Sequence, residues 1–152
     1  MKATKHLILI IAAAALLALA ACSPLVEAAS PGQTPSPAVL ANTRWRLDTF
    51  GAVGAEKAVL PGATLTLDFD DQGLVSGQGG CNSFGGQYKL DNGSLSLSSL
   101  AQTLRACADD SFNQQEAQYM LALGSTARYE LTADHLTIFY DNGASALHDV
   151  KA

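Results

Sequence analysis

Two Asp-Asn-Gly tripeptides, at residues 91–93 and 141–143, each stand between short runs in which apolar and polar residues alternate. Asn-Gly readily takes the positive φ angles of a type I′ turn, which joins two antiparallel strands. The first tripeptide lies between residues 87–90 and 94–98, and the second lies before residues 144–148. These turns restrict the chain to a sheet built largely of hairpins.

The same period of two predicts further strands. In residues 64–69, Leu65, Leu67 and Phe69 alternate with polar neighbours, the pattern of a half-buried strand. Similar runs occupy residues 44–50, 129–131 and 136–140. About eight short strands at this spacing predict a mainly β fold, a compact antiparallel β-barrel or sandwich.

One segment departs from this pattern and predicts a single late α-helix of about twelve residues. Ser111 is expected to cap it, with Gln114 completing a capping box, and Gly124 is expected to end it. Four side chains share one face of this helix and are expected to be core: Phe112, Tyr119, Met120 and Leu123. The expected fold is therefore β-rich α+β.

The start of the chain predicts export. Two lysines precede an apolar run over residues 7–21, which would be about 22 Å long as a helix, too short for a membrane core of ~30 Å. These are the features of a secretory signal peptide. The run ends in Leu19-Ala20-Ala21-Cys22, which resembles the bacterial lipobox, where the cysteine is lipidated and the leader is cut before it. The alternative is an ordinary cleavage site with Cys22 incidental.

We expect a lipoprotein signal peptide over residues 1–21, a tether over 22–42 and one β domain over 43–152. The tether holds four prolines, almost no charge and no periodicity. Acyl chains such as palmitate on Cys22 would anchor the protein. Ser23 follows the cysteine and, by resemblance to bacterial sorting rules, favours the outer membrane, with the domain facing the periplasm.

The charge of the mature chain excludes one class of partner. Removing the leader discards Lys2 and Lys5 and leaves 7 basic against 14 acidic residues, a net charge of −7. Nucleic-acid binding needs clustered Lys and Arg, whereas the four arginines of this chain are dispersed. We expect no nucleic-acid partner.

Five glycines crowd around Cys81 in the stretch GQGGCNSFGGQY, residues 77–88. A phosphate loop needs a lysine at fixed spacing and a helix behind it, but the next lysine is Lys89 and strands flank the stretch. A nucleophilic cysteine needs a base, and only His135 and His148 follow the leader. His148 shares its strand face with small apolar residues that offer no orienting partner. No catalytic residue is expected.

Metal binding is not indicated either. A zinc site would have to gather Cys81, Cys107 and both histidines without any C-x-x-C spacing. The acidic run at residues 68–73 resembles the start of a calcium loop, but the twelfth position holds Gly79 where a glutamate is needed. We expect no metal and no cofactor.

The remaining cysteines predict a structural disulfide. With Cys22 lipidated, only Cys81 and Cys107 are left in an oxidising compartment. The loop that they would close is long enough for a stabilisation of roughly 3–4 kcal/mol.

Four motifs, in order, resemble the META domain family, which includes the HslJ-like, heat-inducible lipoproteins of Gram-negative bacteria. They are Trp45-Arg-Leu, Gly80-Cys-Asn-Ser-Phe-Gly-Gly-Gln-Tyr88, Thr103-Leu-Arg-Ala-Cys107 and Glu116-Ala-Gln-Tyr-Met-Leu-Ala-Leu123. The resemblance covers residues 43–150. It departs at Arg105, where the family often has a methionine.

The resemblance implies a small antiparallel β fold with one helix, an envelope role tied to stress or drug tolerance, and no established enzyme activity. Its motif residues are expected to be structural: Trp45, Gly80, Asn82, Phe84, Gly85, Tyr88, Thr103 and Glu116. Gly79 and Gly80 would let the chain turn sharply, and Gly85 with Gly86 would permit a β-bulge. Asn82 would bond neighbouring backbone groups in the bend.

The sequence thus predicts a lipid-anchored, non-catalytic envelope protein that acts through a protein or envelope partner. Two alternatives remain: a carrier of a small apolar ligand inside the barrel, and an inhibitor of an extracellular hydrolase.

Overall fold

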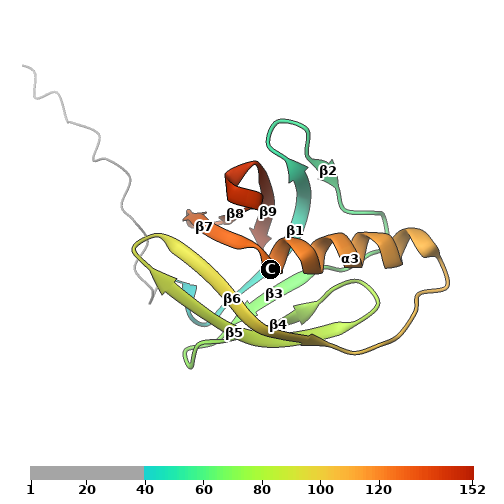
Figure 1. Cartoon of the computed structure of the whole chain (residues 1–152), viewed down its shortest axis with the longest axis horizontal. Coiled ribbons are helices and arrows are strands. Elements are labelled where there is room, and N and C mark those ends of the chain that lie inside the picture. Colours follow the sequence, from blue (N-terminus) through green and yellow to red (C-terminus); the bar gives the residue numbers. More distant parts are fainter. Residues whose placement is uncertain (1–39) are drawn as a thin grey trace, which may run out of the picture. The chain divides into compact units, whose positions relative to one another are not determined.

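The computed structural model describes residues 40–152 and consists of nine strands and one long helix in that range (Figure 1). The predicted signal peptide and Cys22 lie outside the described residues. The elements are β1 (Thr43–Ala52), β2 (Lys57–Ala58), β3 (Thr66–Phe69), β4 (Leu74–Gln78), β5 (Ser83–Asp91), β6 (Ser94–Gln102), α3 (Asp110–Gly124), β7 (Thr126–Leu131), β8 (His135–Tyr140), the 3-10 turn η1 (Asp141–Gly143) and β9 (Ser145–Lys151).

The strands form a closed antiparallel barrel. Their order is β2-β1-β3-β4-β5-β6-β7-β8-β9, and β1 also pairs with β9, from Trp45 opposite Lys151 to Ala52 opposite Ser145. The two-residue β2 pairs with β1 alone, so eight strands make the barrel. The predicted mainly β, antiparallel fold is confirmed. Because β1 pairs with β9, the sheet is closed, so the fold is a barrel and not a sandwich.

Alternation along the strands fills the barrel interior. Trp45 and Leu47 of β1 are buried while their neighbours are exposed, and Leu67 and Phe69 of β3 are buried between half-buried neighbours. Large side chains from all sides of the barrel are less than 2% exposed: Trp45, Tyr119, Leu40, Leu47, Leu65, Leu67, Leu95, Leu123, Leu136, Ile138, Leu147 and Val75. The interior is therefore packed core.

The two Asp-Asn-Gly turns differ in length. In the first, Asn92 and Gly93 have φ of 45° and 84°, so the predicted two-residue turn with positive φ joins β5 to β6. In the second, Asp141, Asn142 and Gly143 all have positive φ, between 52° and 87°. Three successive left-handed residues make a longer turn there, η1, between β8 and β9.

The position of helix α3 was predicted correctly, but the residue that caps its N-terminus was not. The N-cap is Asp109, whose carboxylate accepts the backbone N–H of Ser111 at 2.8 Å, and Ser111 itself stands inside the helix. Asp109 is the stronger cap because its ionised carboxylate also meets the positive end of the helix dipole. The buried face contains Tyr119 and Leu123 as expected, but also two polar residues, Gln115 and Glu116.

Two other features differ from the prediction. Strand β4, which contains Gly77, was not among the runs predicted as strands. A Cβ at Gly77 would lie 1.9 Å from the carbonyl oxygen of Thr66, so the glycine allows close strand packing. Leu40, placed in the tether, is fully buried in the core, so the folded domain begins at least three residues before Thr43. No helix within residues 40–152 has the length and apolarity needed to cross a membrane.

Candidate functional site

Asn82 is the centre of a buried polar cluster in the turn between β4 and β5. Its side chain is 3% exposed, and its amide nitrogen donates to Glu116 Oε2 at 2.6 Å and to the carbonyl of Arg105 at 2.9 Å. Its amide oxygen accepts the Thr103 hydroxyl at 2.8 Å and the Arg105 N–H at 2.7 Å. Two donors and two acceptors are the full capacity of this side chain, so it is completely satisfied.

Glu116, on the inner face of α3, supplies the charge of this cluster. Its side chain is 5% exposed, and Oε1 accepts the N–H groups of Cys81 at 3.2 Å and Asn82 at 2.7 Å. Three donors in all therefore meet one buried carboxylate, which balances the cost of removing it from water. A Cβ at Gly79 would lie 2.7 Å from Oε1, which explains the glycine at that position. We call these contacts the Asn82–Glu116 cluster.

A disulfide lies beside the Asn82–Glu116 cluster. It joins Cys81 to Cys107, with Cα atoms 5.6 Å apart and a sequence separation of 26, which is the predicted pairing. Asn113 of α3 secures the same segment, since its side-chain oxygen accepts the Cys107 N–H at 2.9 Å and its nitrogen donates to the Cys107 carbonyl at 3.3 Å. No sequence signal singled out Asn113, because an asparagine in a helix is usually solvent-facing.

The structure brings most motif residues to this one place. Gly80, with φ of 119°, turns the chain into Cys81, and Thr103 and Cys107 approach from the segment after β6. Phe84 extends the cluster into the core by edge-to-face contact with Tyr119, at 6.1 Å between ring centroids. The predicted bulge is present, since the β5–β6 register shifts between Gly85 and Gln87.

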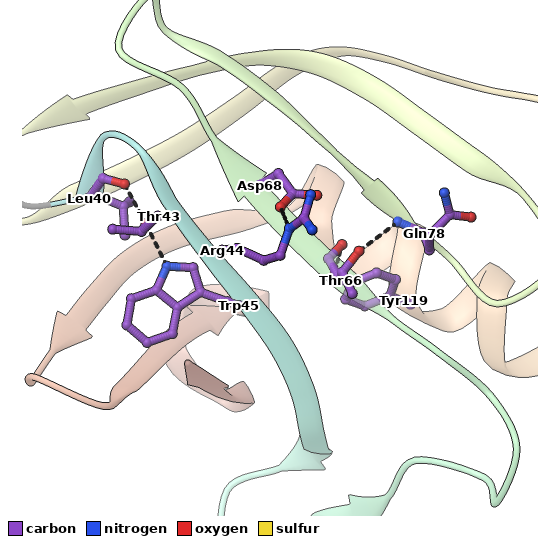
Figure 2. A network of polar contacts seen from close by, with 8 residues as sticks. All are labelled: Leu40, Thr43, Arg44, Trp45, Thr66, Asp68, Gln78 and Tyr119. Atoms are coloured by element: carbon purple, nitrogen blue, oxygen red, sulfur yellow. Dashed lines mark hydrogen bonds and ion pairs between the residues drawn. The ribbon is translucent and has the colours of Figure 1, made fainter. Parts of the chain in front are cut away.

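Two motif residues lie elsewhere in the barrel. Trp45 donates from its indole nitrogen to the Thr43 hydroxyl at 2.7 Å, near the start of β1 (Figure 2). Tyr88 donates its hydroxyl to the carbonyl of Asp70 at 2.6 Å and meets the ring of Phe69 edge-on at 5.0 Å. Both are structural anchors, remote from Asn82 in the hydrogen-bond network.

The expectation for Asn82 was wrong in its partners. It was expected to bond neighbouring backbone in the bend, whereas its partners are 21 to 34 residues away in sequence. The fold places the segment after β6 and helix α3 against the β4–β5 turn. Groups that are distant in sequence therefore make all the hydrogen bonds of the Asn82 side chain.

The expectation that His148 lacks an orienting partner was also wrong. Its Nδ1 lies 3.3 Å from the Thr137 hydroxyl and its Nε2 lies 3.4 Å from Glu56 Oε1. This order of groups is that of a hydrolase triad. Thr137, however, lies inside β8, between Glu130 of β7 and His148 of β9, so the backbone groups around it belong to the ladder and offer no oxyanion hole.

Asp149 is a buried carboxyl that sequence reasoning missed. Its side chain is 1% exposed, both oxygens lack a hydrogen-bond partner within the described residues, and burial raises its pKa to about 8. Tyr119 is fully enclosed nearby, and burial together with Asp149 raises its pKa. The signal was available, because Asp149 shares the inward period of Leu147 on β9. Within residues 40–152, no three His, Cys, Asp or Glu side chains lie where they could share a metal ion.

Comparison with known proteins places this geometry in a family. The model of the META domain matches residues 38–151. The chain belongs to the META domain family. Its META domain is similar to the heat shock protein HslJ of Escherichia coli (strain K12), at 35% identity over 72 residues, which is 47% of this chain and 51% of that protein. The chain thus spans about half the length of the curated relative that it matches.

Solved structures share the fold of this META domain. An NMR structure of a protein from Burkholderia xenovorans matches with a TM-score of 0.66 and 28% identity, over 88% of this chain and 99% of that one. A crystal structure of a DUF4847 family protein from Bacteroides vulgatus matches with a TM-score of 0.53 and 12% identity, over 74% and 94%. The latter shows the fold alone.

Proposed function

We propose that this protein is a lipid-anchored, non-catalytic component of the cell envelope that supports stress or drug tolerance by binding a protein or envelope partner. The anchor is Cys22, and the location is the outer membrane, with the META domain facing the periplasm. The similarity to a heat shock protein supports the link to stress. The lipobox at residues 19–22 supports the anchor.

The proposal of a non-catalytic role depends on one observation: the side chains of the Asn82–Glu116 cluster already have all their hydrogen-bond partners within the protein. Its amide and its carboxylate, the reactive-looking groups of the motif, are buried and fully hydrogen-bonded to the protein itself. A catalytic acid or amide would keep capacity for a substrate. These groups instead fix the end of the barrel, which leaves the surface around it for a partner.

The packed interior does not favour the carrier alternative. Trp45, Tyr119 and Leu136 occupy the inside of the barrel, where an apolar ligand would have to lie. Two open surface grooves, of about 630 and 520 Å³, lie outside it, beside Arg44 and beside Leu121.

Complementation of a deletion strain tests the proposal. We expect deletion to raise sensitivity to heat, detergent or hydrophobic antibiotics. Wild-type protein and the His135→Ala/His148→Ala variant should restore tolerance equally, whereas Cys22→Ser should restore it poorly and should not incorporate labelled palmitate. Loss of tolerance in the histidine variant would contradict the non-catalytic role, and an unchanged deletion strain would contradict the role in tolerance.

A further inference from the structure

The segment between β6 and α3 is held rigidly and yet is wholly exposed at one residue. Figure 1 shows the chain leaving β6 and continuing past the barrel before it turns back into the helix. In this segment Leu104 is 93% exposed, the most exposed large apolar side chain among the described residues. Single exposed leucines are common on protein surfaces, so what distinguishes Leu104 is that both of its chain neighbours are held in place.

The two neighbours of Leu104 are fixed by one side chain. Thr103 donates its hydroxyl to Asn82 Oδ1 at 2.8 Å, and its backbone N–H donates to the Ser83 carbonyl at 3.0 Å. Arg105 has its N–H and its carbonyl both bonded to the Asn82 side chain, at 2.7 and 2.9 Å. Two residues further on, the Cys81–Cys107 disulfide fixes the chain again.

Leu104 itself takes no part in these hydrogen bonds. Within residues 40–152, neither its backbone N–H nor its carbonyl has a hydrogen-bond partner. Its side chain, N–H and carbonyl are therefore presented together, on a backbone whose conformation is already set on both sides. Presenting a prefixed segment lowers the entropy lost on binding, which is how rigid loops reach high affinity.

These are the requirements of a loop that enters the active site of a serine peptidase as a substrate would. The peptidase needs an apolar side chain for its specificity pocket, a free N–H for pairing and a free carbonyl for its oxyanion hole. We propose that Leu104 occupies the specificity pocket of a serine peptidase that prefers apolar side chains, and that the protein thereby inhibits it. This inference rests on the proposed partner-binding function and names the partner's class.

The same contacts explain why such a loop would resist cleavage. Hydrolysis adds water across the bond between Leu104 and Arg105 and leaves a carboxylate on the first and an amine on the second. The Thr103 hydroxyl and the new amino group of Arg105 would both stay bonded to Asn82 Oδ1, and the disulfide would keep the downstream chain in place. Neither new chain end could then leave the active-site cleft of the peptidase readily. The peptidase would therefore hydrolyse the loop slowly and stay bound to it for a long time.

Inhibition of three peptidases by the purified full chain tests the inference. Chymotrypsin and subtilisin, which have apolar pockets, are the matching probes, and trypsin, whose pocket holds a carboxylate, is the mismatch. We expect the wild type to inhibit chymotrypsin or subtilisin on a small chromogenic peptide and not trypsin. Leu104→Asp should weaken inhibition at least about 30-fold, as for a central interface residue. Leu104→Arg should transfer inhibition to trypsin.

Leu121→Asp is the matched control, because Leu121 is also an exposed leucine, at 74%, but lies on α3. It should inhibit as the wild type does, and unfolding midpoints should show that all variants fold. No inhibition by the wild type, or equal inhibition by Leu104→Asp, would overturn the inference. If Leu104→Asp still restores tolerance in the deletion strain, the proposed function stands without this partner class.

Discussion

Asn82 donates its side-chain amide to Glu116 Oε2 over 2.6 Å, although the two residues are 34 positions apart. The bond joins the β4–β5 turn to the middle of α3, and both partners are nearly excluded from water. Buried polar contacts of this kind are costly to break, since the partner left behind remains without water or a hydrogen bond.

Replacing Glu116 should therefore destabilise the domain. Glu116→Gln keeps the shape but has one acceptor fewer: with its amide oxygen on the N–H groups of Cys81 and Asn82, its NH2 would face the side-chain NH2 of Asn82, donor against donor. We expect a loss of about 2–4 kcal/mol in the free energy of unfolding, measured by urea denaturation. Glu130→Gln is the control, because Glu130 is an exposed residue of β7 and should matter little. Equal effects of the two changes would contradict this account of Glu116.

Two glycines of the same stretch should differ in their tolerance of a methyl group. Gly79→Ala would place a Cβ 2.7 Å from Glu116 Oε1, and that carboxylate is held by three hydrogen bonds and cannot move aside easily. We expect a loss of about 1–3 kcal/mol for Gly79→Ala. Gly85→Ala would meet only the Val75 carbonyl at 3.8 Å and should cost less. Comparison of urea midpoints checks the order, and a reversed order would refute it.

Loss of the disulfide should lower stability without abolishing the barrel. The Cys81→Ala/Cys107→Ala variant gives up a bridge across 26 positions, and we expect it to lose about 3 kcal/mol. Dithiothreitol should lower the unfolding midpoint of the wild type and leave that of the variant unchanged. A wild type that is insensitive to dithiothreitol, or that reacts with alkylating reagent at both positions while folded, would show that the bridge is absent.

The buried carboxyl of Asp149 should make stability depend on pH. Its folded-state pKa is raised to about 8, well above the ordinary value for an unfolded chain, so the unfolded chain loses the proton first as the pH rises. The contribution to stability is complete below about pH 4, falls between there and about pH 8, and is lost above it. The slope is on the order of 1 kcal/mol per pH unit.

Urea unfolding at several pH values from 5 to about 8 checks this slope. Asp149→Asn cannot ionise in either state, so its unfolding free energy should vary less with pH than that of the wild type. Its absolute stability is a weaker guide, because the buried amide is also without a partner. Parallel pH profiles for wild type and variant would show that Asp149 is not the group responsible.

Much of the fold could be predicted from local patterns. The period of two in residues 64–69 depends only on which face of a strand meets the core, and the first Asp-Asn-Gly turn depends only on backbone preference. Strand β4 was not predicted, because the local sequence does not show whether a glycine marks a turn or a close approach of two strands. Gly77 marks the close approach of β4 to the backbone of Thr66. The Asp109 cap escaped because two acceptable caps lie close together in sequence.

The site was predictable in its members but not in its contacts. The resemblance named Asn82, Thr103 and Glu116, and the pairing of Cys81 with Cys107 was predicted on the expectation that Cys22 is lipidated. The sequence could not predict that the Asn82 side chain binds both neighbours of Leu104. These contacts depend on where the segment after β6 crosses the β4–β5 turn.

By itself, the sequence determined the antiparallel strands and the helix after residue 109, because periodicity and turn residues act locally, and it predicted the disulfide pairing once Cys22 was assigned to lipidation. Only the tertiary structure decided that β1 closes on β9, that distant groups meet at the side chain of Asn82, and that Leu104 stands exposed between two fixed residues. The physical reason is that a side chain's long-range partners are set by the path of the closed barrel, and many paths satisfy the same local pattern of burial.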